Sequence, residues 1–238
     1  MYKKIILIAS TLTLFSCTIT PTNSVKPKKT PAYSGDLLQF NETRDAQEST
    51  PRMIITDNWL RIDEGKDTDD FVLYDRREKL IYNIVMEEKS ILIMDTTASD
   101  VKADFPLNWK VKSEKSNMLM RTDDTTAARS VHYNFSLNGK SCYDTVALDK
   151  GMDAPLTAIK EYRQALANQL KKYYKPAKGE NCAEAIKILS PNIHLKQGFP
   201  VREWSNYGYQ RFLVDYRQKI IFPERLFQLP EGFSKSKL

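Results

Sequence analysis

Residues 71–94, FVLYDRREKLIYNIVMEEKSILIM, contain three short apolar runs separated by two polar turns. The runs are rich in Ile, Val, Leu and Tyr, residues that favour strands, and the turns fall at 75–78 and 87–89. Such spacing is typical of consecutive hairpins. This stretch therefore predicts an antiparallel meander in which each strand pairs with the next one.

The same strand-and-turn character continues on both sides of this stretch. Within residues 131–137 apolar and polar side chains alternate, which places His132, Asn134 and Ser136 on one face of a strand. Further strands are expected at 37–40, 53–62, 109–111, 130–137, 142–148, 210–217 and 219–222.

One long helix is expected at 154–174. Asp153 is a good N-cap, Pro155 is tolerated in the first turn, and Pro176 and Gly179 end the helix. Its apolar side chains form one stripe: Leu156, Ile159, Tyr162, Leu166, Leu170 and Tyr173. The predicted fold class is α+β, an antiparallel meander sheet packed on one long amphipathic helix. Strong twist around this helix would make the sheet a half-barrel with an apolar concave side.

The N-terminus has the pattern of a signal peptide. Two lysines precede an uncharged apolar run at 5–15, which is too short to span a bilayer as a helix, since that needs about 20 residues. Residues 14–17, LFSC, resemble the lipobox of bacterial lipoproteins, although that family usually has a small residue in place of Phe15. The resemblance implies cleavage after Ser16 and acylation of Cys17. The alternatives are a plain signal peptide with an incidental cysteine, or a buried core helix.

The residue after the lipobox bears on the compartment. Thr18 stands where lipoproteins kept in the inner membrane usually carry Asp, so the resemblance points to a lipid anchor in the outer membrane, facing the periplasm. The inner membrane and the cell surface remain alternatives. The expected divisions are a signal peptide at 1–16, the lipidated cysteine and a flexible Thr-, Pro- and Lys-rich tether at 17–35, one globular domain at 36–233, and a tail at 234–238.

Cys142 and Cys182 remain once Cys17 is assigned to lipid. In the oxidising cell envelope they could form a disulfide, which would restrict the unfolded chain by about 4 kcal/mol in the loop-entropy model. The alternative is two separate buried thiols. A zinc site is not expected, because neither cysteine has a second cysteine or a histidine at ligand spacing.

Composition excludes several classes of protein. The 238 residues are 41% hydrophobic and 28% charged, which excludes a disordered, collagen-like or multi-span membrane chain. Removing the two lysines of the signal peptide from the 36 bases leaves 34 against 30 acids, a net charge of +4. No basic stripe accompanies this small surplus, so no nucleic-acid partner is expected.

The histidines and the acidic loop give no catalytic or metal motif. Neither His132 nor His194 lies in a G-x-S-x-G or H-E-x-x-H pattern, so each is expected to be a polar-face residue. The acidic stretch 63–70 could attract Ca²⁺ but lacks the EF-hand spacing, so a charged hairpin loop is expected.

Three aromatic residues near the C-terminus could bind a ligand. Trp204, Tyr207 and Tyr209 could stack on a sugar or a lipid head group, although cross-strand packing is the favoured interpretation. No phosphate-binding glycine loop is present, and nothing singles out a pair of catalytic carboxylates. No cofactor is expected.

Four segments carry a resemblance to known proteins. Residues 52–55 (RMII), 59–62 (WLRI), 71–76 (FVLYDR) and 79–82 (KLIY) resemble uncharacterised proteobacterial lipoproteins. Together with 227–233 (FQLPEGF), the pattern of 36–233 is loosely similar to lipoprotein-carrier (Lol-type) half-barrels. In those proteins helices cover an incomplete barrel that shelters acyl chains. The segment from Cys142 to Cys182 has no match in this resemblance.

These observations predict a non-enzymatic, membrane-anchored envelope lipoprotein that binds a hydrophobic ligand (a lipid or an acylated protein) or a partner protein. The residues expected to line the site are Leu60, Ile62, Leu73, Ile81 and Ile93. One alternative is a structural or assembly lipoprotein that acts through its outer surface and has a filled core. Another is a periplasmic hydrolase with dispersed active-site residues. An open cavity would favour ligand binding, whereas a cleft with perturbed carboxylates or histidine would favour the hydrolase.

Overall fold

The computed structural model describes residues 32–66, 69–97, 101–116, 118, 128–175 and 181–238. About half of these residues belong to one 13-stranded sheet. Its strands are β1 (Ala32–Arg44), β2 (Gln47–Ser49), β3 (Arg52–Thr56), β4 (Trp59–Asp63), β5 (Phe71–Asp75), β6 (Leu80–Val85), β7 (Ser90–Asp95), β8 (Trp109–Lys115), β9 (Ser130–Leu137), β10 (Lys140–Leu148), β11 (Phe199–Ser205), β12 (Tyr209–Pro223) and β13 (Ser234–Lys237). The helical elements are α1 (Asp153–Lys171), the short α2 (Cys182–Glu184), the π-helical turn η1 (Ala185–Leu189), and the 3₁₀ turns η2 (His194–Gln197) and η3 (Glu224–Phe227).

The sheet is mixed, and at its centre the first strand of the described chain, β1, pairs with the late strand β12. The strand order is β13-β7-β6-β5-β4-β3-β1-β12-β11-β10-β9-β8, with β2 on β1. Strands β3 to β7 pair in chain order, whereas β1 pairs antiparallel with β12 from Ala32↔Pro223 to Arg44↔Tyr209. At one edge β13 runs parallel to β7. In this described part the edge strands β13 and β8 do not pair with each other, so the sheet is not closed.

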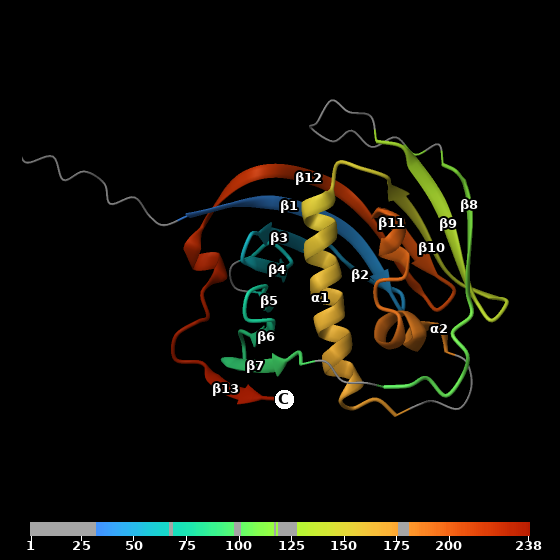
Figure 1. The fold of residues 1–238 in the computed structure, drawn as a ribbon. Coiled ribbons are helices and arrows are strands. Elements are labelled where there is room, and N and C mark those ends of the chain that lie inside the picture. The colour runs from blue at the N-terminus through green and yellow to red at the C-terminus, as the bar shows by residue number, and fades with distance from the viewer. Residues whose placement is uncertain (1–31, 67–68, 98–100, 117, 119–127, 176–180) are drawn as a thin grey trace, which may run out of the picture. The chain divides into compact units, whose positions relative to one another are not determined.

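Helix α1 lies on the concave side of the sheet, which arches over it (Figure 1). Of the six stripe residues only Ile159 is buried, whereas Leu170 and Tyr173 are 38% and 60% exposed. The residues that α1 buries are mostly small: Pro155, Ala158, Ile159, Ala165, Ala167 and Gln169. The fold class predicted from the sequence, an antiparallel meander on one long amphipathic helix, is therefore wrong. Apolar periodicity indicates strands, faces and helical turns, but it does not show which distant strands pair or which helical face is covered.

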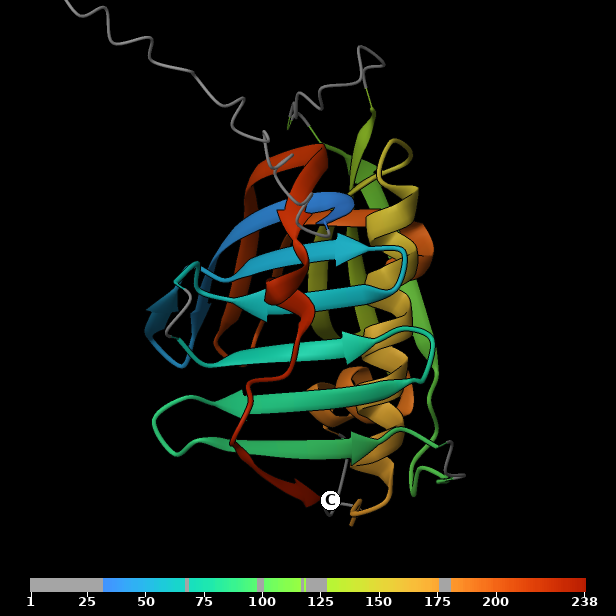
Figure 2. The same ribbon diagram turned by 90° about the vertical axis from the view of Figure 1, so that its left-hand side faces the viewer.

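Two hydrophobic clusters cover opposite faces of strands β3 to β7. One lies between the sheet and α1, and the other lies under the C-terminal segment, which crosses these strands on their outer side (Figure 2). Alternation along each strand divides the predicted lining residues between the two clusters. Leu60, Ile62 and Ile81 belong to the α1 side, whereas Leu73 and Ile93 belong to the outer side.

The ends of the folded part differ from the expected boundaries. Residues 32–35, expected in the tether, are the start of β1, and 234–237, expected as a tail, form β13. Cys17 and the expected signal peptide lie outside the described residues. Within the described residues no helix is long and apolar enough to cross a membrane.

Candidate functional site

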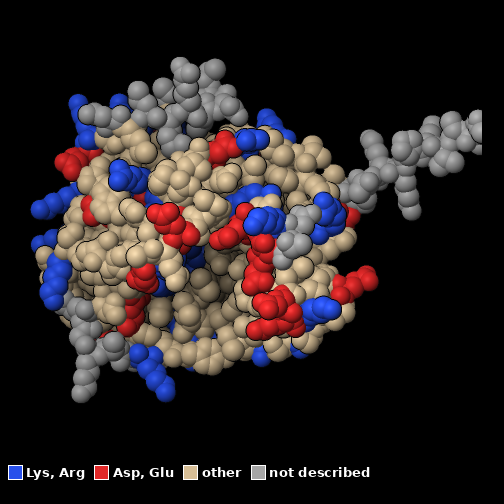
Figure 3. Space-filling model, turned by 180° about the vertical axis from the view of Figure 1, so that it is seen from behind, with Lys and Arg blue, Asp and Glu red and all other residues tan. Residues whose placement is uncertain are grey.

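A cavity of about 460 Å³ lies between α1 and the concave face of the sheet. This volume falls within the roughly 300–1,000 Å³ of pockets that hold small ligands. Figure 3 shows the molecule hollowed on the side opposite α1, with acidic and basic residues around the hollow. Among the uncharged lining residues are Pro51, Met53, Ile62, Ile159, Leu166, Leu170 and Ile186, with the tyrosines Tyr143, Tyr162, Tyr207 and Tyr209. The charged ones are Glu42, Arg44, Asp45, Arg163, Lys187 and Arg211.

Four residues of the apolar stripe of α1 border the cavity: Ile159, Tyr162, Leu166 and Leu170. The first three also pack in the hydrophobic cluster between the sheet and α1, so the cavity lies beside this cluster. Of the five lining residues expected from the sequence, only Ile62 borders this cavity.

Two hairpin ends meet at the rim of the cavity. The β11–β12 turn places Tyr207 and Tyr209 in its wall on either side of Gly208, which has a φ of +80°. The backbone N–H of Asp45, in the β1–β2 turn, donates to the carbonyl of Gly208 over 3.1 Å. The third aromatic residue singled out in the sequence, Trp204, does not line the cavity.

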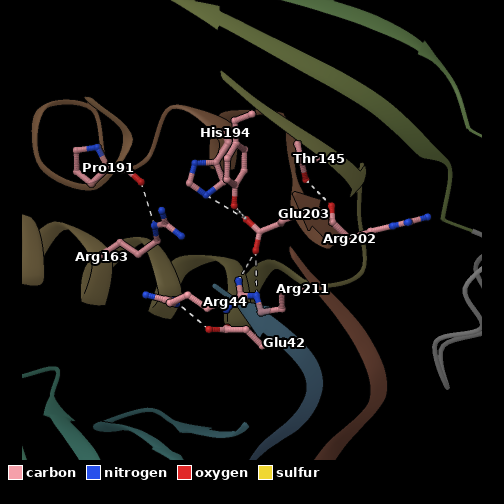
Figure 4. Close-up of polar contacts among 10 residues, drawn as sticks. Glu42, Arg44, Thr145, Arg163, Pro191, His194, Arg202, Glu203 and Arg211 are labelled. Carbon is pink, nitrogen blue, oxygen red and sulfur yellow. Dashed lines mark hydrogen bonds and ion pairs between the residues drawn. The ribbon is translucent and has the colours of Figure 1, made fainter. Parts of the chain in front are cut away.

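Behind this wall, Glu203 on β11 is the centre of a buried polar cluster (Figure 4). Its carboxylate accepts hydrogen bonds from Tyr143 Oη (2.9 Å) and from Arg211 Nε (3.0 Å) and Nη2. His194 Nε2 lies 3.3 Å from Glu203 Oε1. Burial alone would raise the pKa of Glu203, but Arg211, His194 and Arg163 outweigh it and hold that pKa well below its usual range. The carboxylate is therefore charged, and both of its oxygens accept hydrogen bonds.

His194 is buried rather than on a polar face, so the expectation for this residue is wrong. Burial, with a further contribution from the charge of Arg163, lowers the pKa of His194 to about 4. Its ring packs 5.1 Å from that of Tyr143 and does not line the cavity. The imidazole is therefore neutral at pH 7, and it packs behind Tyr143 in the cavity wall.

Arg163 is the cation that α1 adds to the wall. Its Nε donates to the carbonyl of Pro191 over 3.0 Å. Arg44, by contrast, pairs with Glu42 over 2.9 Å and lies 5.3 Å from the centre of the Tyr209 ring. The charged wall is therefore built by residues from β1, α1 and β12 together.

A disulfide fixes one side of the cavity. The structure joins Cys142 on β10 to Cys182 at the start of α2, with their Cα atoms 5.4 Å apart. The next element, η1, contributes Ile186 and Lys187 to the lining. The bridge therefore holds this part of the wall against the sheet.

The other histidine lies in a cross-strand cluster away from the cavity. His132 Nδ1 is 2.8 Å from Glu114 Oε1, and its Nε2 is 2.8 Å from Asp144 Oδ1. Its ring stacks on that of Trp204, with the centroids 5.2 Å apart. Trp204 therefore packs across strands.

The acidic stretch 63–70 is only partly a solvated loop. Asp63 is buried and pairs with Arg52 (2.7 Å) and Arg61 (2.5 Å), while Asp70 Oδ1 accepts a hydrogen bond from the Met86 N–H. Residues 67–68 lie outside the described residues. In the part of the chain that is described, no group of histidine, cysteine and acidic side chains is arranged to hold a metal ion.

The sequence reasoning missed Glu203, Arg211 and Arg163. A signal existed for the first two, since Glu203 continues the inward-facing series of Phe199 and Val201, where a charge is unexpected. It is also the register partner of Arg211. No local signal distinguishes Arg163 from the other charged residues of α1.

No protein-family model and no curated protein sequence matches this chain. Its fold is similar to that of an uncharacterised conserved protein from Thermus thermophilus, with a TM-score of 0.42 and 9% identity over 87% of this chain and 91% of that one. It is also similar to part of PNGF-II, in two crystal forms, with TM-scores of 0.38 and 0.39 and 8% identity. The match covers 86% of this chain but only 31% and 32% of the PNGF-II chains. TM-scores this low carry no argument about function.

Proposed function

We propose that this protein is a membrane-anchored lipoprotein of the bacterial envelope that binds a hydrophobic ligand and is not an enzyme. The anchor would be Cys17, in the lipobox-like residues 14–17. The observation that carries the binding proposal is the cavity under α1, whose wall includes Ile159, Leu166 and Ile62. Apolar surface that a ligand removes from water contributes about 25 cal/mol per Å².

Two features favour ligand binding over the alternative functions. A structural lipoprotein with a filled core has no need of a cavity of about 460 Å³ beside the main core. A hydrolase needs reactive groups that face its substrate. His194 and Glu203, whose pKa values are both lowered, are buried behind the wall and do not line the cavity.

The test is native mass spectrometry with lipid extraction on the full chain carrying Cys17→Ser, exported and purified without detergent. We expect a stoichiometric co-purified lipid or acylated peptide. Leu166→Trp fills the cavity and should remove this ligand. Ile221→Trp places the same side chain at a position on β12 that is 66% exposed and should retain it. A ligand-free mass for the Cys17→Ser protein, or a ligand that survives Leu166→Trp, would count against the proposal.

A further inference from the structure

Arg163 differs from the other guanidinium groups of the cavity because it forms no ion pair with a carboxylate of the described residues. Arg44 is paired with Glu42, and Arg211 with Glu203. No carboxylate of the described residues lies within ion-pair distance of Arg163, whose Nε donates to the carbonyl of Pro191. Figure 4 shows its guanidinium between Pro191 and the His194–Glu203 pair. Its terminal nitrogens are therefore held in place by the Pro191 contact and remain available to a ligand.

The charged side chains in and directly behind the cavity wall have a net charge of one positive unit. The cavity is lined by Arg44, Arg163, Lys187 and Arg211, against the carboxylates of Glu42 and Asp45 and that of Glu203 behind them. One positive charge remains. A half-buried cation is stabilised when an anion joins it, because its own hydration is reduced. A ligand with a single negative charge would neutralise this wall.

A hydroxyl donor lies in the same wall. Burial raises the pKa of Tyr209 well above its ordinary value, so its hydroxyl keeps its proton at neutral pH. A phenol in this state can donate a hydrogen bond to an anion.

The face of α1 that borders the cavity carries both a positive charge and a row of apolar side chains. Ile159, Arg163, Leu166 and Leu170 follow one another at spacings of three and four residues, and all four line the cavity. A ligand whose anionic end meets Arg163 can therefore lie with its chain along the leucines of the same helix.

We propose that the cavity binds an amphiphile with one apolar chain and a carboxylate head group, and that Arg163 receives the carboxylate. This inference rests on the ligand-binding function proposed above. A guanidinium matches the two oxygens of a carboxylate through parallel hydrogen bonds. The single surplus positive charge favours a monoanion over a phosphate monoester, which carries up to two charges.

The experiment is isothermal titration calorimetry of the full chain carrying Cys17→Ser with three probes of one chain length: laurate, dodecanol and dodecyl phosphate. We expect laurate to bind at least about tenfold more tightly than dodecanol, because a charged hydrogen-bonded contact is added. Arg163→Gln should weaken laurate binding about 10- to 100-fold and leave dodecanol unchanged. Lys171→Gln removes one charge from the same helix outside the cavity and should change neither affinity.

The outcomes separate this inference from the function on which it rests. Equal binding of laurate and dodecanol by the parent chain, or full laurate affinity in Arg163→Gln, overturns the role of Arg163 and leaves hydrophobic-ligand binding in place. Tighter binding of dodecyl phosphate than of laurate overturns the carboxylate assignment. Binding of none of the three probes overturns the proposed function itself. The comparison of probes on the parent chain needs no variant, so it decides the matter even if Arg163→Gln fails to fold.

Discussion

Glu203 and Arg211 are register partners across the β11–β12 hairpin, and both are buried. Arg211 donates to the same carboxylate oxygen from Nε, at 3.0 Å, and from Nη2. The guanidinium also lies over the ring of Phe40 on β1, with its Cζ 4.5 Å from the ring centre. The ion pair therefore connects three strands at the base of the cavity.

Arg211→Met should strongly destabilise the protein, because it leaves a buried carboxylate without its cation. Breaking a buried pair in this way costs about 3–5 kcal/mol. The measurement is the free energy of unfolding from urea titration. Arg217→Met removes an exposed arginine that pairs with Asp215, and should cost no more than about 1 kcal/mol. Equal losses for the two variants would show that the Glu203–Arg211 pair has no special role in stability.

The stability of the protein should fall as the pH is lowered from about 6.5 to about 4. His194 has a pKa of about 4 in the folded protein against 6.5 for the free group, so the unfolded chain takes up a proton first. Its contribution is fully present above 6.5 and is lost toward 4, with a total of roughly 3 kcal/mol. Urea unfolding at a series of pH values measures this loss.

The matched pair for that experiment is His194→Gln and His132→Gln. The first variant should flatten the profile between pH 6.5 and 4, because the titrating imidazole is gone. The second should keep the fall, because His194 is retained. A profile that is unchanged in His194→Gln would assign the pH dependence to other groups.

The Cys142–Cys182 bridge should stabilise the domain by roughly 2–4 kcal/mol, because it shortens the accessible unfolded chain. Changing both cysteines to serine should lower the urea midpoint accordingly, and adding a reductant to the parent chain should have the same effect. The serine variant itself should not respond to reductant. Equal stability of reduced and oxidised parent chain would mean that the bridge contributes nothing.

Labelled palmitate should attach to the full chain through Cys17 when the protein is made in a bacterium that processes lipoproteins. Cys17→Ser should abolish the label and release the protein from the membrane fraction. Cys182→Ser serves as the control that loses a cysteine elsewhere and should remain labelled. Persistent labelling of Cys17→Ser would refute the lipobox interpretation of residues 14–17.

Local patterns predicted the local parts of this fold. Strands β5, β6 and β7 pair through short turns, so the apolar runs at 71–94 and their spacing were sufficient to place them. The pairing of β1 with β12, however, depends on segments far apart in the chain. The sequence SKSK of β13 has no apolar residue, so nothing in it indicates a strand. Periodicity therefore placed β5 to β7, but it took 53–62 as one strand where the structure has the hairpin β3–β4, and it did not indicate that β1 pairs with β12 or that β13 pairs with β7.

The sequence indicated residues of the site only where the amino-acid type itself suggested ligand binding. Tyr207 and Tyr209 attract attention as aromatic residues beside a glycine, and both line the cavity. Arg163 matters because its Nε is bound to the carbonyl of Pro191 and no carboxylate of the described residues forms an ion pair with it, and that relationship exists only after folding. The difference lies in the tertiary environment of each charge, which a single sequence does not display.

The pairing of β1 with β12 also sets the order of events during biogenesis. The middle of the sheet needs residues 32–44 and 209–223 together, so it cannot form until the segment 209–223 has emerged. Before that moment β1 can already pair with β3, and β1 then presents an open backbone edge where β12 will later bind. A chain truncated before β12 therefore lacks a central strand of the sheet, not an edge strand. The strand edges exposed by this loss are open to intermolecular pairing.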